Sequence, residues 1–220
     1  MNHVLILANG DWGSEDSVVR LHDLASQADY VLAADGALDH ALRQGIHVDT
    51  LIGDLDSVMD PGTLEERLPD LEVLRFSREK DETDLELAIE WALGQSPSLL
   101  TLFGASGHRL DHTLANLALL EKGLHAGVPM VAVCGCETVR MIQRTITLND
   151  AAVGDRVSLL PVSLFATVST RGLQYPLSGE KLFRATGRGV SNVVESLPVE
   201  ISVESGVLTV VHAMGGGKAV

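Results

Sequence analysis

Acidic side chains follow two successive apolar runs of the sequence, where each run would end as a strand. Asp54 and Asp56 follow one run, spaced by two residues, and Asp81 and Asp84 follow the next. If the chain stays extended past the first run, Asp54 and Asp56 point to the same side. Paired carboxylates repel each other unless a hard cation lies between them, and oxygen-rich Mg²⁺ sites are built in this way. The pattern predicts a metal site.

The segment 104–109, Gly-Ala-Ser-Gly-His-Arg, is a loop of mostly small residues between a predicted strand and a predicted helix. Such a loop lets backbone N–H groups and a helix N-terminus face an anion. Arg109 would supply a fixed positive charge, and Asp111 could orient it or reach a metal-bound water. The loop has neither the Lys-Ser/Thr ending of a Walker loop nor the spacing of a dinucleotide fingerprint. We interpret it as a phosphate-binding loop outside both classes.

Each cluster also has a purely structural explanation. Asp56 could cap a following helix while Asp54 lies in a solvated turn, and Asp81 or Asp84 would be favoured in the first turn of a helix by its dipole. The clusters recur, however, at the same end of successive predicted strands. Because ligands of an open parallel sheet bind beyond the carboxyl ends of its strands, this placement favours one shared cleft for metal and phosphate.

The composition restricts the partners. The 220 residues carry a formal net charge of −14, which argues against a nucleic-acid or anionic-membrane partner. A small polyanion would need divalent cations as a bridge. We expect no signal peptide and no membrane span, and therefore a cytoplasmic protein. Cys134 and Cys136 form an isolated Cys-x-Cys, which we interpret as ordinary thiols.

The first part of the chain alternates short β-branched runs with amphipathic stretches, as in a parallel sheet flanked by helices. Thr83 and Glu86 form a capping box that predicts a helix over 83–93. A leucine stripe that includes Leu110 and Leu114 predicts a single helix over 111–124.

After about residue 137 the pattern changes to strand periodicity, and Glu204-Ser205-Gly206 predicts a hairpin between the last two strands. We expect an α/β fold with two domains. Residues 1–136 would form a Rossmann-like parallel sheet with flanking helices, which binds nucleotide and metal. Residues 137–220 would form an all-β sandwich.

Six motifs resemble, in chain order, those of thiamine pyrophosphokinases (thiamin diphosphokinases). They are DGALDHAL from Asp35, IGDLDS from Ile52, KDETDLELAI from Lys80, GASGHRLDHTLANL from Gly104, TRGLQYPL from Thr170 and GRGVSN from Gly187. The last two are similar to β-domain motifs of the bacterial branch. Each piece is short, but the ordered set spans nearly the whole chain.

The resemblance implies an α/β nucleotide-binding domain and a β-sandwich that binds thiamine and forms a homodimer. It implies transfer of the pyrophosphoryl group of ATP to the hydroxyethyl oxygen of thiamine, giving thiamine diphosphate and AMP, with Mg²⁺ as cofactor. Asp35 would lie near the reacting end, and Ser191 and Asn192 would border the thiamine pocket. The implied metal ligands are Asp54, Asp56, Asp81 and Asp84. The implied nucleotide-binding residues are Lys80, Thr83, Asp84 and Arg109. The implied catalytic set is Asp54, Asp56, Asp81, Asp84, Arg109 and Asp111.

Two positions depart from the family pattern. Val193 and Val194 stand where the family often has Glu and an aromatic residue after Ser-Asn, and no aromatic residue occurs in 207–212. The missing aromatic favours an alternative, a pyrophosphokinase for another heterocyclic alcohol. Two further alternatives are a metal-dependent phosphatase in which Asp54 is phosphorylated and a non-catalytic nucleotide-binding module.

Overall fold

The computed structural model describes residues 1–107 and 109–215. Its chain divides into two units, Met1–Gly135 and Cys136–Val220, where the sequence predicted domains of 1–136 and 137–220. No helix among the described residues is long and apolar enough to cross a membrane.

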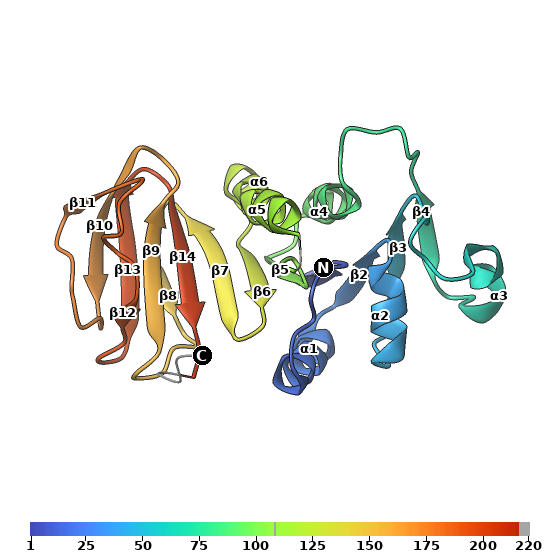
Figure 1. Ribbon diagram of the computed structural model, residues 1–220, viewed down its shortest axis with the longest axis horizontal. Helices are drawn as coiled ribbons and strands as arrows, with labels where there is room; N and C mark the ends of the chain where they lie inside the picture. Colours follow the sequence, from blue (N-terminus) through green and yellow to red (C-terminus); the bar gives the residue numbers. More distant parts are fainter. Residues whose placement is uncertain (108, 216–220) are drawn as a thin grey trace. The chain divides into compact units, whose positions relative to one another are not determined.

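The first unit is a parallel sheet between two layers of helices. The sheet order is β6-β5-β1-β2-β3-β4, and every neighbouring pair is parallel. Helices α4, α5 and α6 lie on one face, and α1 and α2 lie on the other (Figure 1). The strands are β1 His3–Leu7, β2 Tyr30–Ala34, β3 Thr50–Gly53, β4 Glu72–Arg75, β5 Leu99–Phe103 and β6 Met130–Cys134. The helices are α1 Glu15–Gln27, α2 Ala37–Arg43, the 3-10 turn η1 Pro61–Thr63, α3 Leu64–Arg67, α4 Asp84–Gly94, α5 Leu110–Ala118 and α6 Leu120–Ala126.

Because helices cover both faces of the sheet, its strands consist of continuous apolar runs in the sequence. Leu5 and Leu7 of β1 belong to the core packed with α1 and α2, while the alternating Val4 and Ile6 are equally buried on the other face. From β1 the chain proceeds through β2, β3 and β4 in one direction and then crosses to β5 on the other side of β1. The direction of winding therefore reverses between β1 and β5, which opens a crevice at their carboxyl ends.

Helix α4 follows its sequence signals closely. The Thr83 hydroxyl accepts a hydrogen bond from the Glu86 N–H at 3.2 Å, so Thr83 is the predicted N-cap. The second half of the capping box is wrong, because the Glu86 carboxylate pairs with Lys122 at 3.0 Å instead. The buried face of α4 consists of Leu85, Ala88, Ile89 and Ala92, which recur at the helical spacing.

The sequence predicted one continuous helix over 111–124, and this prediction is wrong. The segment is divided at Leu119 into α5 and α6, and Leu110 and Leu114 of the expected buried stripe are 70% and 61% exposed. The buried contacts come instead from Leu120 and Gly123 of α6. A Cβ on Gly123 would lie 2.6 Å from the Met130 side chain, so glycine at this position allows α6 to lie close to the start of β6.

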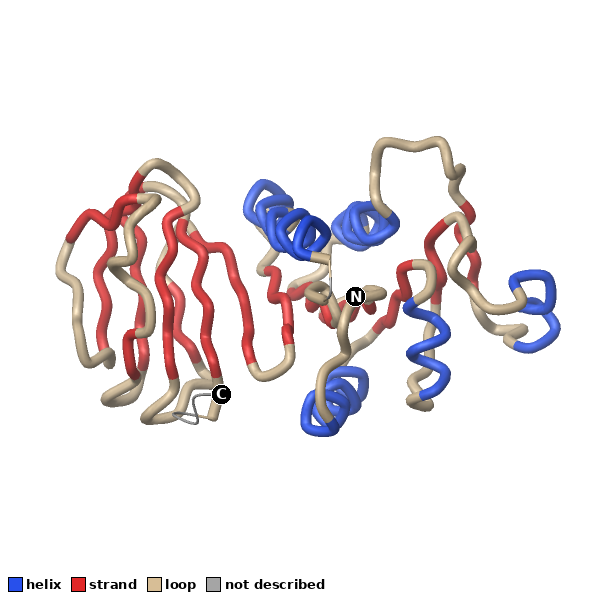
Figure 2. The backbone as a smooth tube through the Cα atoms, viewed as in Figure 1, coloured by secondary structure: helices blue, strands red, loops and turns tan. Residues whose placement is uncertain are grey.

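The second unit is a sandwich of two antiparallel sheets, ordered β12-β9-β14-β7 and β11-β10-β13-β8. Among described residues 136–215 none lies in a helix, and Figure 2 shows strands joined by loops. The apolar core between the sheets includes Val157, Val168, Ile201 and Val210. The strands are β7 Glu137–Ile142, β8 Ile146–Leu148, β9 Arg156–Pro161, β10 Phe165–Arg171, β11 Glu180–Phe183, β12 Asn192–Val193, β13 Val199–Ser205 and β14 Leu208–Ala213.

The predicted hairpin between β13 and β14 is wrong. β13 pairs with β10 and β8, whereas β14 pairs with β7 and β9, so the turn at Gly206 carries the chain from one sheet to the other. Both arrangements bury the same alternating residues, which is why the periodicity does not distinguish them.

Candidate active site

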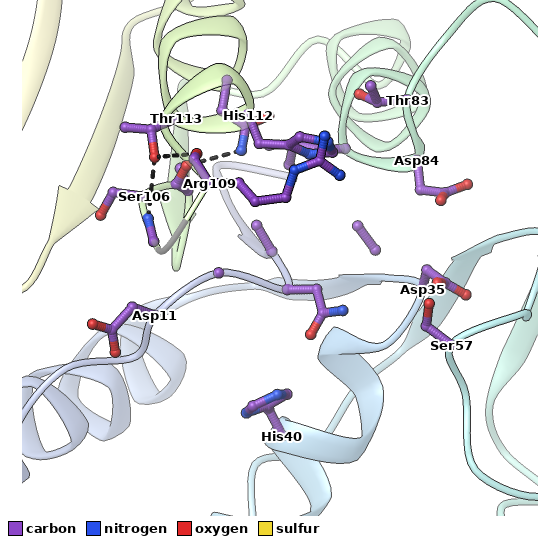
Figure 3. Close-up of a pocket in the computed structure, with 18 of the residues that line it drawn as sticks. Asp11, Asp35, His40, Ser57, Thr83, Asp84, Ser106, Arg109, His112 and Thr113 are labelled. Atoms are coloured by element: carbon purple, nitrogen blue, oxygen red, sulfur yellow. Dashed lines mark hydrogen bonds between the residues drawn. The ribbon is translucent and has the colours of Figure 1, made fainter.

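The crevice between β1 and β5 is formed by two loops that bond to each other. The Gly10 N–H donates to the Gly104 carbonyl at 3.0 Å, and the Asp11 N–H donates to the Ser106 carbonyl at 2.7 Å. Gly10 has to be glycine, because a Cβ there would lie 2.2 Å from both carbonyl oxygens. These loops and those after β2 and β3 line a cavity of about 820 Å³ (Figure 3). Its volume is typical of a small-molecule site.

Three carboxylates converge in this cavity. One oxygen from each of Asp35, Asp54 and Asp84 lies within 4.8 Å of the other two. They come from the ends of β2 and β3 and from the first turn of α4, three elements that the parallel sheet brings to one edge. Three oxygens at this spacing are suited to a hard divalent cation.

Asp35 is the most constrained member of this cluster. It is only 7% exposed, it has a left-handed backbone with φ of 45°, and among described residues its Oδ1 has no hydrogen-bond partner. A Cβ on Gly53 would lie 3.0 Å from the Asp35 Cβ, so the glycine makes room for the side chain. A buried carboxylate oxygen without a hydrogen-bond partner is costly. This indicates that Asp35 Oδ1 binds a ligand that is not part of the protein.

The electrostatic environment of Asp35 agrees with this. Burial raises the pKa of Asp35 above its usual value, Asp84 and Asp56 add to the effect, and interactions with Ser57 and the Gly36 N–H oppose it. A cation between the carboxylates would relieve both the burial penalty and the repulsion.

Asp54 and Asp56 are not held on one side of an extended strand, so that prediction is wrong. β3 ends at Gly53, Leu55 has a left-handed φ of 66°, and the Asp56 N–H donates to Asp54 Oδ1 at 3.0 Å. The Asp54 side chain is 14% exposed and belongs to the three-carboxylate cluster, whereas Asp56 is 43% exposed and lines the cavity outside it. Arg78 lies 3.3 Å from Asp56 and 3.9 Å from Asp54.

The other residues predicted near α4 have different placements. Thr83 and Asp84 line the cavity. Lys80 Nζ lies 2.5 Å from Asp84 Oδ1 and partly offsets its charge. Asp81 is exposed and, among described residues, is not part of the cavity lining.

Arg109 also lines the cavity, and it occupies the N-cap position of α5. It makes a two-point contact with Asp111, with Nη2–Oδ2 at 2.6 Å and Nε–Oδ1 at 3.2 Å. This hydrogen-bonded contact raises the pKa of Arg109 and lowers that of Asp111. Asp111 is therefore placed to orient the guanidinium, the first of the two roles considered for it.

Side chains of α5 fix the loop that carries Arg109. Thr113 Oγ1 accepts from the Gly107 N–H at 3.2 Å and donates to the Arg109 carbonyl at 3.1 Å. Asn116 Nδ2 donates to the Ala105 carbonyl at 2.8 Å. Both residues lie within the GASGHRLDHTLANL motif, and their i+4 and i+7 spacing from Arg109 places them on one helix face, although neither had a predicted role of its own.

The cavity also contains residues that had no individual role in the predictions from sequence. They are Asn9, Asp11, Trp12, His40, Ser57, Ser106 and His112. The Asn-Gly-Asp after the first strand was a visible signal for Asn9 and Asp11. Trp12 carried no such signal, and His40 lies within DGALDHAL without a role of its own, because only the tertiary fold brings α2 and the loop after β1 together.

Ser191 and Asn192 lie in the second unit. Asn192 is buried, and its amide holds the backbone of Tyr175, with Oδ1 accepting from the N–H at 3.0 Å and Nδ2 donating to the carbonyl at 2.8 Å. Ser191 is exposed, and its N–H donates to Ser158 Oγ at 3.0 Å. Asn192 thus has a structural role whether or not it contacts a ligand.

Comparison with known proteins identifies relatives along most of the chain. The family model of the thiamin pyrophosphokinase catalytic domain matches residues 21–132, and that of the thiamin pyrophosphokinase vitamin B1 binding domain matches residues 143–208. A segment of 89 residues is 39% identical to thiamine pyrophosphokinase of Bacillus subtilis (strain 168) and makes up 40% of this chain and 41% of that protein.

Solved structures show the same fold. The crystal structure of thiamine pyrophosphokinase from Bacillus subtilis has a TM-score of 0.84 at 24% identity, covering 96% of this chain and 99% of that one. The crystal structure of thiamin pyrophosphokinase from Geobacillus thermodenitrificans has a TM-score of 0.81 at 28% identity, covering 97% and 98% of the two chains. With both domain models matched in chain order, the chain belongs to the thiamin pyrophosphokinase family.

Proposed function

We propose that this protein transfers the pyrophosphoryl group of ATP to the hydroxyethyl oxygen of thiamine, giving thiamine diphosphate and AMP. Family membership supports the two substrates. The observation that carries the chemistry is the convergence of Asp35, Asp54 and Asp84 in one cavity that Arg109 also lines. Transfer of a phosphoryl-type group needs positioning and neutralisation of phosphate charge more than covalent help from the protein.

Mg²⁺ is the proposed cofactor. Asp35, Asp54 and Asp84 fit it, because all three offer oxygen ligands and Asp35 Oδ1 lacks a partner among described residues. When bound, Mg²⁺ would neutralise charge on the phosphate oxygens. Asp56 lines the cavity just outside the cluster and would reach water around the ion. The metal-binding role of Asp81 stays a prediction.

The side chains around the cavity would divide the remaining work. Arg109, oriented by Asp111, would hold two phosphate oxygens with its forked guanidinium. Lys80 would hold Asp84 in place, and Thr83 would fix the start of α4. Asp35 and Asp54 are the two candidates to accept the proton of the attacking hydroxyl.

Nucleotide product analysis tests this function. With ATP, Mg²⁺ and thiamine, we expect AMP and thiamine diphosphate in equal amounts, and no turnover when thiamine or Mg²⁺ is omitted. ADP as the stoichiometric product would contradict pyrophosphoryl transfer. AMP formed only with a different heterocyclic alcohol would favour the alternative acceptor, which the missing late aromatic residue supports. Inorganic phosphate released without an acceptor would indicate a phosphatase.

We also propose that the second unit binds thiamine near Ser191 and Asn192 and that the protein is a homodimer. The match to the vitamin B1 binding domain supports the first statement. Leu110 and Leu114, exposed one turn apart on α5, are consistent with the second, because a subunit contact would cover them. Light scattering tests the dimer, and the KM for thiamine of Ser191→Ala tests the pocket.

A further inference from the structure

The wall of the active-site cavity contains a rigid aromatic element that the proposed chemistry does not use. Trp12 is buried, its indole N–H donates to the Ala8 carbonyl at 2.9 Å, and the edge of Phe103 contacts it with ring centroids 5.5 Å apart. A Cβ on Gly104 would lie 2.8 Å from the indole nitrogen, so a glycine is needed for Trp12 to occupy this position. The indole is therefore held on several sides.

His40 of α2 lies against this indole. The two ring centroids are 5.3 Å apart with an interplanar angle of 33°, so Trp12 packs against the imidazole in a tilted arrangement. His40 is half-buried and lines the cavity, and Figure 3 shows it projecting from α2 on the side opposite Arg109 and His112. The part of the ring that a ligand can reach is the part that faces the cavity.

The environment of the imidazole favours its neutral form, and the ring has unused hydrogen-bonding capacity. Burial lowers the pKa of His40, and the nearby Arg43 lowers it further, although Asp39 opposes them. Within the described part of the chain neither ring nitrogen makes a hydrogen bond. Arg109, and the carboxylate cluster through a bound Mg²⁺, already provide for phosphate groups. An imidazole that favours its neutral form adds little to them. It suits a planar, polar heteroaromatic ring, which can stack on its face and bond to its edge.

We propose that His40, supported by Trp12, is a stacking platform for the heteroaromatic ring of a substrate and helps to determine which substrate the cavity accepts. The proposal rests on the proposed function, because ATP and thiamine both carry such a ring, the adenine and the aminopyrimidine. The shared chemistry is stacking of a nitrogen heterocycle on the imidazole, and the two sources are distinguished by separate kinetic measurements.

The kinetic test compares His40→Ala and His40→Phe with wild type. We expect His40→Ala to raise one of the two KM values about fivefold, the factor that corresponds to about 1 kcal/mol of ring stacking at 25 °C. The other KM and kcat should stay within about twofold, since the phosphate-binding groups are untouched. His40→Phe keeps a flat ring and should restore most of the affinity. His22→Ala, an exposed histidine on α1, is the control and should match wild type.

A binding measurement keeps the test independent of turnover and of the fold of the alanine variant. The sequence has two tryptophans, so Trp91→Phe leaves Trp12 as the sole indole reporter. In that background we expect a saturable change in Trp12 fluorescence on titration with either Mg²⁺–AMP or thiamine. The ligand that produces the change should be the one whose KM rises in His40→Ala.

Each outcome of these measurements either supports the proposal or overturns it. A rise in the KM for ATP assigns the platform to adenine, and a rise in the KM for thiamine assigns it to the aminopyrimidine. Unchanged KM values in His40→Ala, a His40→Phe variant as weak as His40→Ala, or no fluorescence change with either ligand would overturn the proposal. If wild type made no thiamine diphosphate, the proposed function would fail, while the fluorescence titrations would still test stacking separately.

Discussion

Replacing Asp35 by Asn should stabilise the protein in the absence of metal and weaken its response to Mg²⁺. Asp35 is buried, its Oδ1 has no partner among described residues, and carboxylate oxygens of Asp54 and Asp84 lie within 4.8 Å. Asn has nearly the same shape without the charge, so the substitution removes repulsion and burial cost together. A residue kept for binding often lowers stability in this way.

The magnitude follows from the geometry. At an effective dielectric constant of 20, two unit charges 4.8 Å apart repel by about 3.5 kcal/mol. Solvent reaches Asp54 and Asp84, and Lys80 lies 2.5 Å from Asp84, so the net repulsion is smaller. We expect a gain of about 1 kcal/mol in the free energy of unfolding at neutral pH, or about 2–4 °C in Tm.

The gain should depend on pH. The pKa of Asp35 in the folded protein is raised above its usual value of 3.8, so the carboxyl contributes full stability below that value and loses it as pH rises through the raised pKa. Asn has no such loss. The difference between variant and wild type should therefore be small near pH 3.8 and largest at neutral pH.

Thermal unfolding of both proteins from pH 4 to pH 8, in EDTA and in saturating Mg²⁺, measures this. Wild type should gain Tm on adding Mg²⁺, because a ligand that binds only the folded state stabilises it, and the variant should gain less. Asp70→Asn, an exposed carboxylate outside the cavity, is the control. A metal-free variant less stable than wild type at pH 7, or one with an undiminished Mg²⁺ response, would refute the reasoning.

Three other predictions concern single hydrogen-bonded groups. Thr83→Ala should cost about 1 kcal/mol by removing the N-cap of α4, and an unchanged urea midpoint would contradict it. Arg109→Lys should lower kcat more than it raises the KM for ATP, because an ammonium cannot bridge two phosphate oxygens. A raised KM at constant kcat would contradict this and would mean that Arg109 only binds ATP in the ground state. Burial acts to raise the pKa of Asp155, but bonds from the Ala152 N–H, His212 and the Gly215 N–H outweigh it and hold the pKa below its usual value. Asp155→Asn should therefore cost about 1–3 kcal/mol at neutral pH, and less as pH falls through the pKa of the folded state, in urea unfolding followed by circular dichroism; a cost independent of pH would exclude this charge effect.

Local signals determined much of the first unit. The apolar runs 30–34 and 99–103 correspond residue for residue to β2 and β5, because a strand buried on both faces needs only an unbroken apolar segment. Thr83 and the four buried residues of α4 were also predictable, because a cap and a helix face depend on residues within three or four positions. The clustering of carboxylates at strand ends followed from the parallel order alone.

Tertiary structure decided which of those carboxylates meet. Asp35 joins Asp54 and Asp84 because β2 lies beside β3 and both Asp35 and Leu55 adopt left-handed backbone conformations, which no periodicity encodes. The sandwich places β13 and β14 in different sheets, although their alternation fits a hairpin equally well. Residue spacing reports on neighbours within a turn or a strand, whereas the order of strands and the packing of His40 on Trp12 depend on contacts between distant segments, whose free energy appears only when the whole core forms.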